Sequence, residues 1–121
     1  MSKTILIADD SSSLRQMVSM TLSRAGYGVV EATDGLDALA KAEGKSIGLF
    51  ITDLNMPRMN GLELIRRLRA GTAHRFTPAL MLTTESDPTK KQEGRVAGAT
   101  GWILKPFNPD QLLAVVKKVM P

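Results

Sequence analysis

Five short apolar runs alternate with five segments of helical periodicity, and this alternation limits the fold more than any other feature of the sequence. The first, third and fourth runs are almost continuously apolar, which is typical of strands buried on both faces. Strands that alternate with helices at short spacing predict an α/β fold, a doubly wound five-stranded parallel sheet with five helices. The predicted strands are residues 4–8, 28–32, 49–52, 79–83 and 102–104.

The ends of most predicted helices carry recognisable signals. An apolar stripe at i, i+3, i+4, i+7 and i+8 predicts the first helix, and Gly26 suits the left-handed conformation that ends helices. Either Asp10 or Ser11 is expected to cap its start. Three further helices are preceded by good capping residues, namely Asp34, Asn60 and Asn108. Gly44 and Gly71 are expected to close two of these helices.

The fourth predicted helix is the weakest. Asp87 and Pro88 provide a good start, but Gly94 lies inside the segment and the apolar stripe is thin, with Val96 and Ala97 as its main members. A glycine inside a helix costs about 1 kcal/mol relative to alanine. We therefore expect this helix to be the least stable one, a property that is useful in a conformational switch.

Length and composition exclude several classes of protein. The 121 residues fit one domain, and the absence of cysteine excludes disulfides and thiolate metal sites. The N-terminal apolar run is too short for a signal peptide, and no run approaches the roughly 20 apolar residues of a membrane span. A cytoplasmic protein without a membrane contact is expected. The net charge of +4 is spread over several helices, which indicates solvated surfaces rather than a nucleic-acid site.

Acidic residues and a lysine follow three of the predicted strands. Asp9 and Asp10 follow the first strand, Asp53 follows the third, Thr83 ends the fourth and Lys105 follows the fifth. In open parallel sheets, ligands bind beyond the carboxyl ends of the strands. Each of these residues alone could equally be a turn former, a cap or a surface residue. Their joint position predicts that three carboxylates, a hydroxyl and an ammonium group converge on one shallow site.

Such a site has a definite chemistry. Crowded carboxylates raise one another's pKa, and a divalent cation relieves the repulsion. Oxygen-only ligands favour Mg²⁺, which a substrate phosphate often completes. Lys105 and Thr83, together with the cation, could neutralise and hydrogen-bond the oxygens of a phosphoryl group. One carboxylate could then act as the nucleophile and become an aspartyl phosphate.

These residues, with the motif Thr-Asp-Leu-Asn-Met-Pro around Asp53 and Lys105-Pro106-Phe107, resemble the response regulator receiver domain over the whole chain. Within that family the sequence is most similar to single-domain chemotaxis regulators. The resemblance implies one receiver domain over residues 1–121. It also implies a flavodoxin-like sheet with the strand order 2-1-3-4-5.

The resemblance implies a role for each residue of the site. Asp53 would accept a phosphoryl group from a histidine kinase. Asp10, Asp53 and the backbone carbonyl of Asn55 would bind Mg²⁺, and Asp9 would act through a metal-bound water. Lys105 would contact the phosphoryl group.

Further residues would report or tune phosphorylation. Thr83 would move toward the phosphoryl group, followed by an aromatic side chain that in this family is usually tyrosine or phenylalanine. Trp102 occupies that position here, and it could instead be a partly exposed packing residue. Asn55 and Glu85 occupy the positions that tune dephosphorylation, and the peptide bond before Pro106 is expected to be cis.

The function implied is that of a phosphorylation-switched binding module, with no enzymatic activity beyond its own phosphorylation and dephosphorylation. The expected partners are a histidine kinase of the CheA type, an output target such as a flagellar motor switch protein, and a phosphatase. No output domain is expected after the last helix, so a monomer would act through its own surface, formed by the fourth helix, fifth strand and fifth helix.

Other functions remain open at this stage. A phosphate sink or phosphorelay intermediate would use the same site without an output target. A phosphatase of the haloacid dehalogenase type requires Asp-x-Asp after the first strand, whereas here the two aspartates are adjacent and Asp53 is followed by Leu54 and Asn55. Nucleic-acid binding is supported only by the net charge. His74, the single histidine, is expected to be an exposed loop residue rather than a phosphorelay group.

Overall fold

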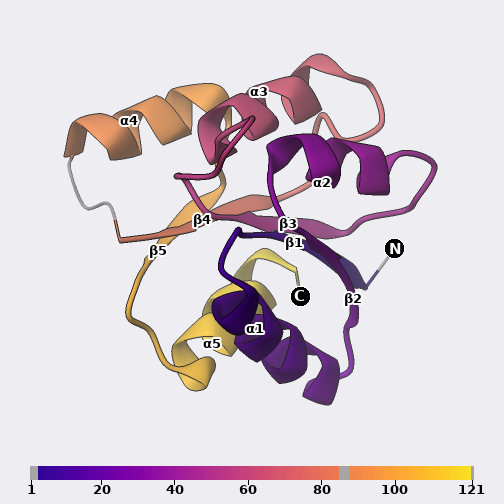
Figure 1. The fold of residues 1–121 in the computed structure, drawn as a ribbon, viewed down its shortest axis with the longest axis vertical. Coiled ribbons are helices and arrows are strands. Elements are labelled where there is room, and N and C mark those ends of the chain that lie inside the picture. Colours follow the sequence, from indigo (N-terminus) through magenta and orange to yellow (C-terminus); the bar gives the residue numbers. More distant parts are fainter. Residues whose placement is uncertain (1–2, 85–87, 121) are drawn as a thin grey trace.

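The computed structural model describes residues 3–84 and 88–120, and these form one parallel sheet in the order β2-β1-β3-β4-β5, flanked by helices (Figure 1). This is the predicted fold class and strand order. The strands are β1 (Thr4–Ala8), β2 (Gly28–Ala32), β3 (Leu49–Thr52), β4 (Ala79–Thr83) and β5 (Gly101–Leu104). The helices are α1 (Ser12–Arg24), α2 (Gly35–Ala42), α3 (Gly61–Ala70), α4 (Pro88–Ala97) and α5 (Pro109–Val119).

The sheet separates two hydrophobic cores. Helices α1 and α5 cover one face, and α2, α3 and α4 cover the other (Figure 1). Side chains along each central strand alternate between the two cores, so that Leu6 and Phe50 contribute to one core and Ile5 and Ile51 to the other. The apolar runs of β1, β3 and β4 are therefore continuous because both faces of these strands are buried.

The helix caps follow the sequence signals. Ser11, not Asp10, caps α1 by accepting the backbone N–H of Leu14. The predicted caps Asp34, Asn60 and Asn108 each accept the backbone N–H of the residue three positions on. Gly26 adopts a φ of 97° after α1, as predicted, and Gly44 adopts 74° after α2.

Helix α4 differs from its prediction at Val96, a residue that is 76% exposed and takes no part in an apolar stripe. The buried residues of the helix are Gly94 and Ala97. A Cβ atom on Gly94 would lie 2.8 Å from Cζ3 of Trp102, so the indole ring occupies the space above the glycine. The glycine thus serves packing as well as weakening the helix. Asp87, the predicted start, lies outside the described residues.

The expectation that His74 is an exposed loop residue is wrong in part. His74 lies in the loop between α3 and β4, but its ring packs edge-on against Phe50, with 5.0 Å between the ring centroids. Burial lowers the pKa of His74, against the opposing effect of a hydrogen bond to the backbone of Ala42. Its half-buried position follows from the proximity of this loop to the first residues of β3.

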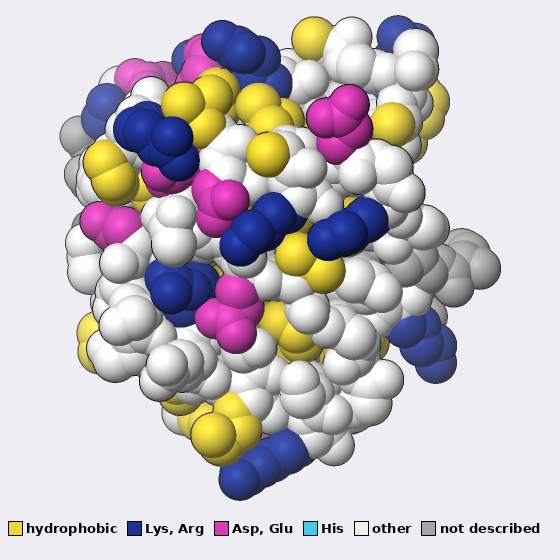
Figure 2. Space-filling view, turned by 45° about the vertical axis from the view of Figure 1, so that its right-hand side comes forward, with side chains coloured by type: hydrophobic (Ala, Val, Ile, Leu, Met, Phe, Trp, Pro, Cys, Tyr) yellow, Lys and Arg dark blue, Asp and Glu magenta, His cyan; other side chains and the backbone are white. Residues whose placement is uncertain are grey.

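The surface carries charges of both signs. On the face drawn in Figure 2, lysine and arginine side chains are interspersed with aspartate and glutamate rather than gathered into one block. Within residues 3–84 and 88–120, no helix is both long enough and apolar enough to cross a bilayer.

Candidate functional site

The carboxyl ends of β1, β3 and β5 bring together Asp9, Asp10, Asp53 and Lys105. One carboxylate oxygen from each of the three aspartates lies within 4.8 Å of the other two. The Nζ atom of Lys105 is 3.2 Å from Oδ2 of Asp9 and 3.5 Å from Oδ2 of Asp53. Residues that are up to 96 positions apart in the sequence therefore form one cluster. It lies at the carboxyl ends of the strands, where the sequence analysis predicted that these side chains converge.

Backbone hydrogen bonds attach these residues to the sheet. The N–H of Asp53 donates to the carbonyl of Ala8 at 2.9 Å, and the N–H of Asp9 donates to that of Ala32 at 3.1 Å. The N–H of Lys105 donates to the carbonyl of Thr83 at 2.9 Å. The parallel ladder thus continues one residue beyond the regular strands, which fixes the backbone of these residues at the edge of the sheet.

Asp9 and Asp53 are buried, whereas Asp10 is exposed. Burial raises the pKa of Asp53; the positive charge of Lys105 opposes this shift, and the negative charge of Asp9 adds to it. One oxygen of each buried carboxylate accepts a backbone N–H, from Ser11 at 2.9 Å and from Leu54 at 2.8 Å. The other oxygen of each faces Lys105, so the lysine binds both carboxylates together.

The cluster has the composition of a site for a hard cation. Three carboxylates face a single ammonium group, which leaves an excess of negative charge at one place. Only oxygen ligands are offered, and hard divalent cations prefer such ligands. The acidic cluster could therefore hold a metal ion. Asn55, whose carbonyl is a further candidate ligand, is an exposed residue two positions after Asp53.

The predicted switch residues lie on the two strands next to the cluster. Thr83, the last residue of β4, is fully buried and accepts the N–H of Lys105 through its carbonyl. Trp102 on β5 is partly buried and packs against the core beneath α2, α3 and α4. The peptide bond between Lys105 and Pro106 is cis, as predicted. Glu85, the second residue predicted to tune dephosphorylation, lies outside the described residues.

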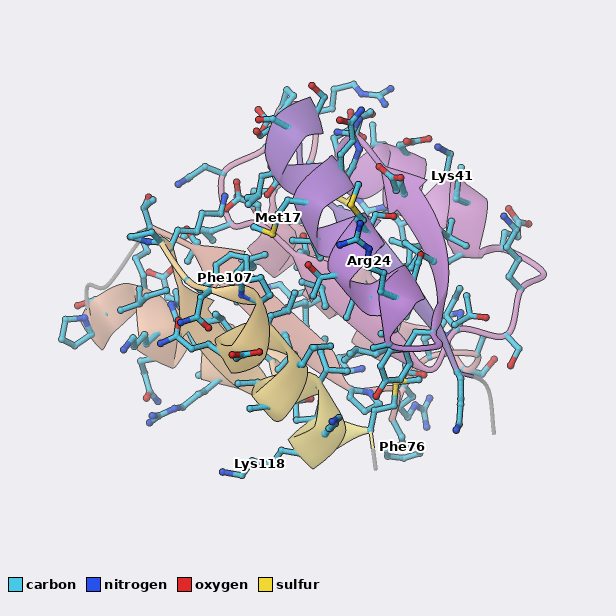
Figure 3. All side chains as sticks on the ribbon, turned by 90° about the horizontal axis from the view of Figure 1, so that it is seen from below. Met17, Arg24, Lys41, Phe76, Phe107 and Lys118 are labelled. Carbon is cyan, nitrogen blue, oxygen red and sulfur yellow. The ribbon has the colours of Figure 1, made fainter. Side chains whose placement is uncertain are left out.

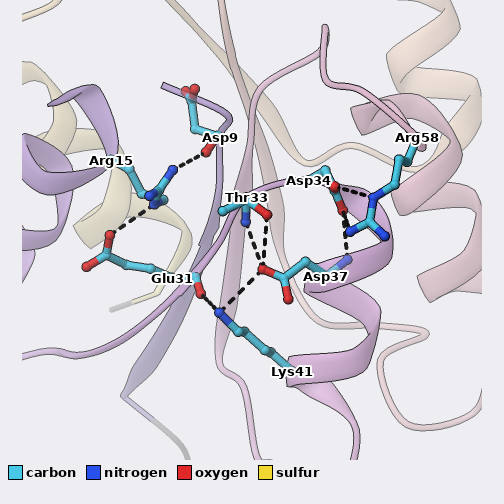
Figure 4. A network of polar contacts seen from close by, with 8 residues as sticks. All are labelled: Asp9, Arg15, Glu31, Thr33, Asp34, Asp37, Lys41 and Arg58. Carbon is cyan, nitrogen blue, oxygen red and sulfur yellow. Dashed lines mark hydrogen bonds and ion pairs between the residues drawn. The ribbon is translucent and has the colours of Figure 1, made fainter. Parts of the chain in front are cut away.

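Two arginine contacts, one with Asp9 and one in the loop after Asp53, were not predicted from the sequence (Figure 4). Arg15 donates to the carbonyl oxygen of Asp9 at 2.7 Å and pairs with Glu31 at 3.1 Å. Arg58, in the loop after Asp53, donates two hydrogen bonds to Asp34, at 2.7 and 3.0 Å. These pairs join residues 6, 16 and 24 positions apart, and no local sequence pattern announces them.

Comparisons with known proteins agree with this geometry. Residues 5–117 match the family model of the response regulator receiver domain. The chain is 38% identical over 118 residues to the chemotaxis protein CheY1 of Helicobacter pylori strain J99, a match that covers 96% of this chain and 95% of the relative. It is 51% identical to the chemotaxis protein CheY4 of Vibrio cholerae, whose crystal structure superposes with a TM-score of 0.94 over 98% of this chain and 99% of that one. The BeF₃-activated receiver domain of DrrB is 30% identical, with a TM-score of 0.88 over 98% of this chain and 97% of that one.

Proposed function

The chain belongs to the response regulator receiver domain family, and we propose that phosphorylation of Asp53 switches its surface between two binding states. The observation that supports this most directly is the position of Asp53, a buried carboxylate that shares Lys105 with Asp9 beside the exposed Asp10. A nucleophile, a cation-binding cluster and an ammonium group at one sheet edge suit phosphoryl transfer.

The metal ion is proposed to be Mg²⁺, held by Asp10, Asp53 and the carbonyl of Asn55, with Asp9 acting through a water. When bound, it supplies positive charge that offsets the carboxylates and the phosphoryl oxygens. An oxygen of Asp53 attacks the phosphorus of a phosphohistidine, the P–O bond forms, and the P–N bond breaks as the imidazole leaves. Lys105, already within 3.5 Å of Asp53, pairs with the incoming phosphoryl oxygens.

Thr83 and Trp102 are proposed to transmit the change. The hydroxyl of Thr83 lies on the strand end next to Lys105 and donates to the phosphoryl group after it arrives. Movement of Trp102 would change the packing of α4, because the ring occupies the space above Gly94. We place the output surface on α4, β5 and α5, as the family resemblance implies, and a shift in population there would change the affinity for a target.

The process is proposed to be chemotaxis signalling in the cytoplasm, with a histidine kinase of the CheA type as the phosphodonor and a flagellar motor switch protein as the target. The similarity to chemotaxis proteins supports a regulator with an output target over a phosphate sink. The monomer would catalyse only its own phosphorylation and dephosphorylation, assisted by a phosphatase. Asn55 and Glu85 would set the lifetime of the aspartyl phosphate.

The test is the intact mass of the protein after incubation with acetyl phosphate and Mg²⁺. We expect one added phosphoryl group on the wild type and none on Asp53→Asn or when EDTA replaces Mg²⁺. Asp37→Asn is the matched control, because it changes an aspartate at the same sheet edge but outside the cluster; it should be phosphorylated like the wild type. Phosphorylation of Asp53→Asn to the same extent, or none in the wild type, would contradict the proposal.

A second readout reports the switch. Beryllofluoride with Mg²⁺ should change the fluorescence of Trp102, the single tryptophan, and Asp53→Asn should abolish the change. Phosphorylation without a fluorescence change would support the site but contradict the proposed role of Trp102.

A further inference from the structure

The edge of the sheet opposite Asp53, where the strands begin, carries an apolar hollow of about 250 Å³. Its walls come from three segments that are distant in the sequence: the loop before β3, the loop before β4 and the end of α5. Their apolar contributions are Ile47, Pro78, Val119 and Met120. The hollow is separate from the phosphorylation site, since it lies at the other ends of the same strands.

An exposed aromatic side chain stands beside this hollow. Phe76 is 89% exposed, the highest value among the large hydrophobic side chains in the described part of the chain. It directly precedes Thr77 and Pro78, which line the hollow, and Figure 3 shows it near the end of α5. Exposed aromatic residues next to an apolar depression are characteristic of interaction surfaces.

Positive charges flank each segment that forms the hollow. Lys45 directly precedes Ser46, the first residue that lines the hollow. Arg75 precedes Phe76, and Lys117 and Lys118 precede Val119. All four are exposed, and none forms an ion pair with another described residue. One acidic side chain, Glu43, occurs in the same loop as Lys45.

The topology accounts for only part of this charge. Helices that connect parallel strands end at the edge where the strands begin, and basic residues are favoured in the last turn of a helix. Lys117 and Lys118 follow this rule in α5. Lys45 and Arg75 lie in loops, outside any helix, so helix stability does not explain their positive charge.

We propose that this basic, apolar edge docks an acidic segment of a partner protein, which inserts an aliphatic or aromatic side chain into the hollow. Charge complementarity favours an acidic partner, and a concave site favours an inserted side chain over a flat membrane surface. A second copy of this chain fits less well, because most acidic side chains at its opposite edge already have partners within the chain. Asp34 pairs with Arg58, Asp37 with Lys41, Glu63 with Arg67, and Asp9 and Asp53 with Lys105.

Docking at this edge is independent of the proposed phosphorylation of Asp53. The hollow involves no residue of the acidic cluster, of α4 or of β5. Of α5, the third element of the proposed output surface, it involves only the last residue, Val119. The partner would therefore hold the protein at a location or near its phosphodonor, while the opposite end remains available for phosphorylation. Binding is expected with the same affinity in the presence and absence of beryllofluoride.

The probe is a fluorescein-labelled peptide with a central leucine–phenylalanine pair and three glutamates on each side, and fluorescence anisotropy measures its binding. The triple variant Lys45→Gln/Arg75→Gln/Lys118→Gln should weaken binding about tenfold or more, since each exposed ion pair changes affinity about two- to fivefold. Phe76→Ser should weaken it about fivefold or more. Peptides with serine in place of the central pair, or glutamine in place of glutamate, should also bind more weakly.

The matched control removes three positive charges elsewhere, by Lys90→Gln/Lys91→Gln/Arg95→Gln on α4. This variant should keep the affinity of the wild type within about twofold. All substituted residues lie at the surface, so unchanged circular dichroism and phosphorylation by acetyl phosphate would show that each variant is folded. Amide NMR shifts on addition of the peptide should cluster at residues 45–48, 75–78 and 117–120.

Several results would overturn the proposal. These are the absence of peptide binding, binding lost in the α4 variant but kept in the Lys45/Arg75/Lys118 variant, and shifts centred on α4 and β5. Binding to anionic vesicles that depends on Phe76, without binding to the peptide, would show that a membrane and not a protein segment occupies this edge. A concentration-dependent dimer that the triple variant abolishes would instead identify a second copy as the occupant.

Discussion

Arg58 clamps the loop that follows Asp53. Its φ of 64° lies in the left-handed region, which is uncommon for a residue other than glycine. Its guanidinium binds both carboxylate oxygens of Asp34, which is buried and also caps α2. Next to this pair, the N–H of Gly35 donates to the carbonyl of Met59 at 3.1 Å. A single arginine therefore ties the loop after the proposed phosphorylation site to the start of α2.

This pair should make stability depend on pH. The hydrogen bond from Arg58 is the largest cause that lowers the pKa of Asp34 below its usual 3.8. A carboxyl group with a lowered pKa in the folded state stabilises the protein above its unfolded pKa and loses this effect as the pH falls through the folded pKa. Arg58→Gln should therefore lower Tm at pH 7 by about 1–3 °C. The difference in Tm from the wild type should shrink as the pH falls below about 4.

Thermal unfolding at a series of pH values measures this effect. Arg67→Gln is the matched control, because it removes an arginine that pairs with Glu63 on the open surface of α3, and it should change Tm less at pH 7. A difference between Arg58→Gln and the wild type that grows toward low pH would contradict the role assigned to the pair.

For individual residues, the sequence predicts the positions of side chains that directly follow a strand. It misses the contacts that depend on tertiary packing. Asp9, Asp53 and Lys105 could be placed together because each follows a recognisable strand. The pairing of Arg58 with Asp34 spans 24 positions and requires a loop conformation that no local pattern specifies. His74 was expected to be exposed because it lies in a predicted loop, yet the ring of Phe50 packs against it.

Among the elements, α4 shows how packing changes the meaning of a residue. From the sequence, Gly94 indicates only a weak helix, since glycine costs helical stability. In the structure it is buried beneath the indole of Trp102, where a larger side chain does not fit. Val96 was expected to face the core but is exposed, because the small residues Gly94 and Ala97 form the inward face. Periodicity could not show this, since the inward face carries almost no hydrophobic side chain.

Gly94→Ala should therefore displace Trp102 rather than simply strengthen the helix. The helix gains about 1 kcal/mol from alanine, but the new methyl group would lie 2.8 Å from the indole ring. We expect the ring to move outward, with a red shift of tryptophan emission in the unphosphorylated protein and no net gain in Tm.

The matched control for this prediction is Gly71→Ala at the end of α3, where the nearest atoms to a new Cβ are 3.9 Å away and φ is −85°. That substitution should leave the emission unchanged and raise the free energy of unfolding by a few tenths to about 1 kcal/mol. A higher Tm with an unchanged emission spectrum in Gly94→Ala would show that the indole does not depend on this glycine.

For the molecule as a whole, the order of the strands is the property least available from residue patterns. Continuous apolar runs distinguish the central strands β1, β3 and β4 from the half-exposed β2 and β5. They do not say which central strand pairs with which edge strand, because the side chains of every central strand meet the same apolar surroundings. The order β2-β1-β3-β4-β5 was available only through the family resemblance.

This architecture should produce a gradient of local stability across the molecule. Helices α3 and α4 each span ten residues, but α3 buries five of them, including Leu62, Leu64, Ile65 and Leu68, whereas α4 buries only Gly94 and Ala97. Local opening of α4 therefore exposes far less apolar surface than opening of α3. Native-state amide hydrogen exchange should be slowest in β1, β3 and β4. It should be at least about a hundredfold faster in α4 than in α3. Equal protection of the two helices would show that the indole of Trp102 anchors α4 as firmly as a full hydrophobic stripe anchors α3. The proposed switch would then have to act on a rigid helix.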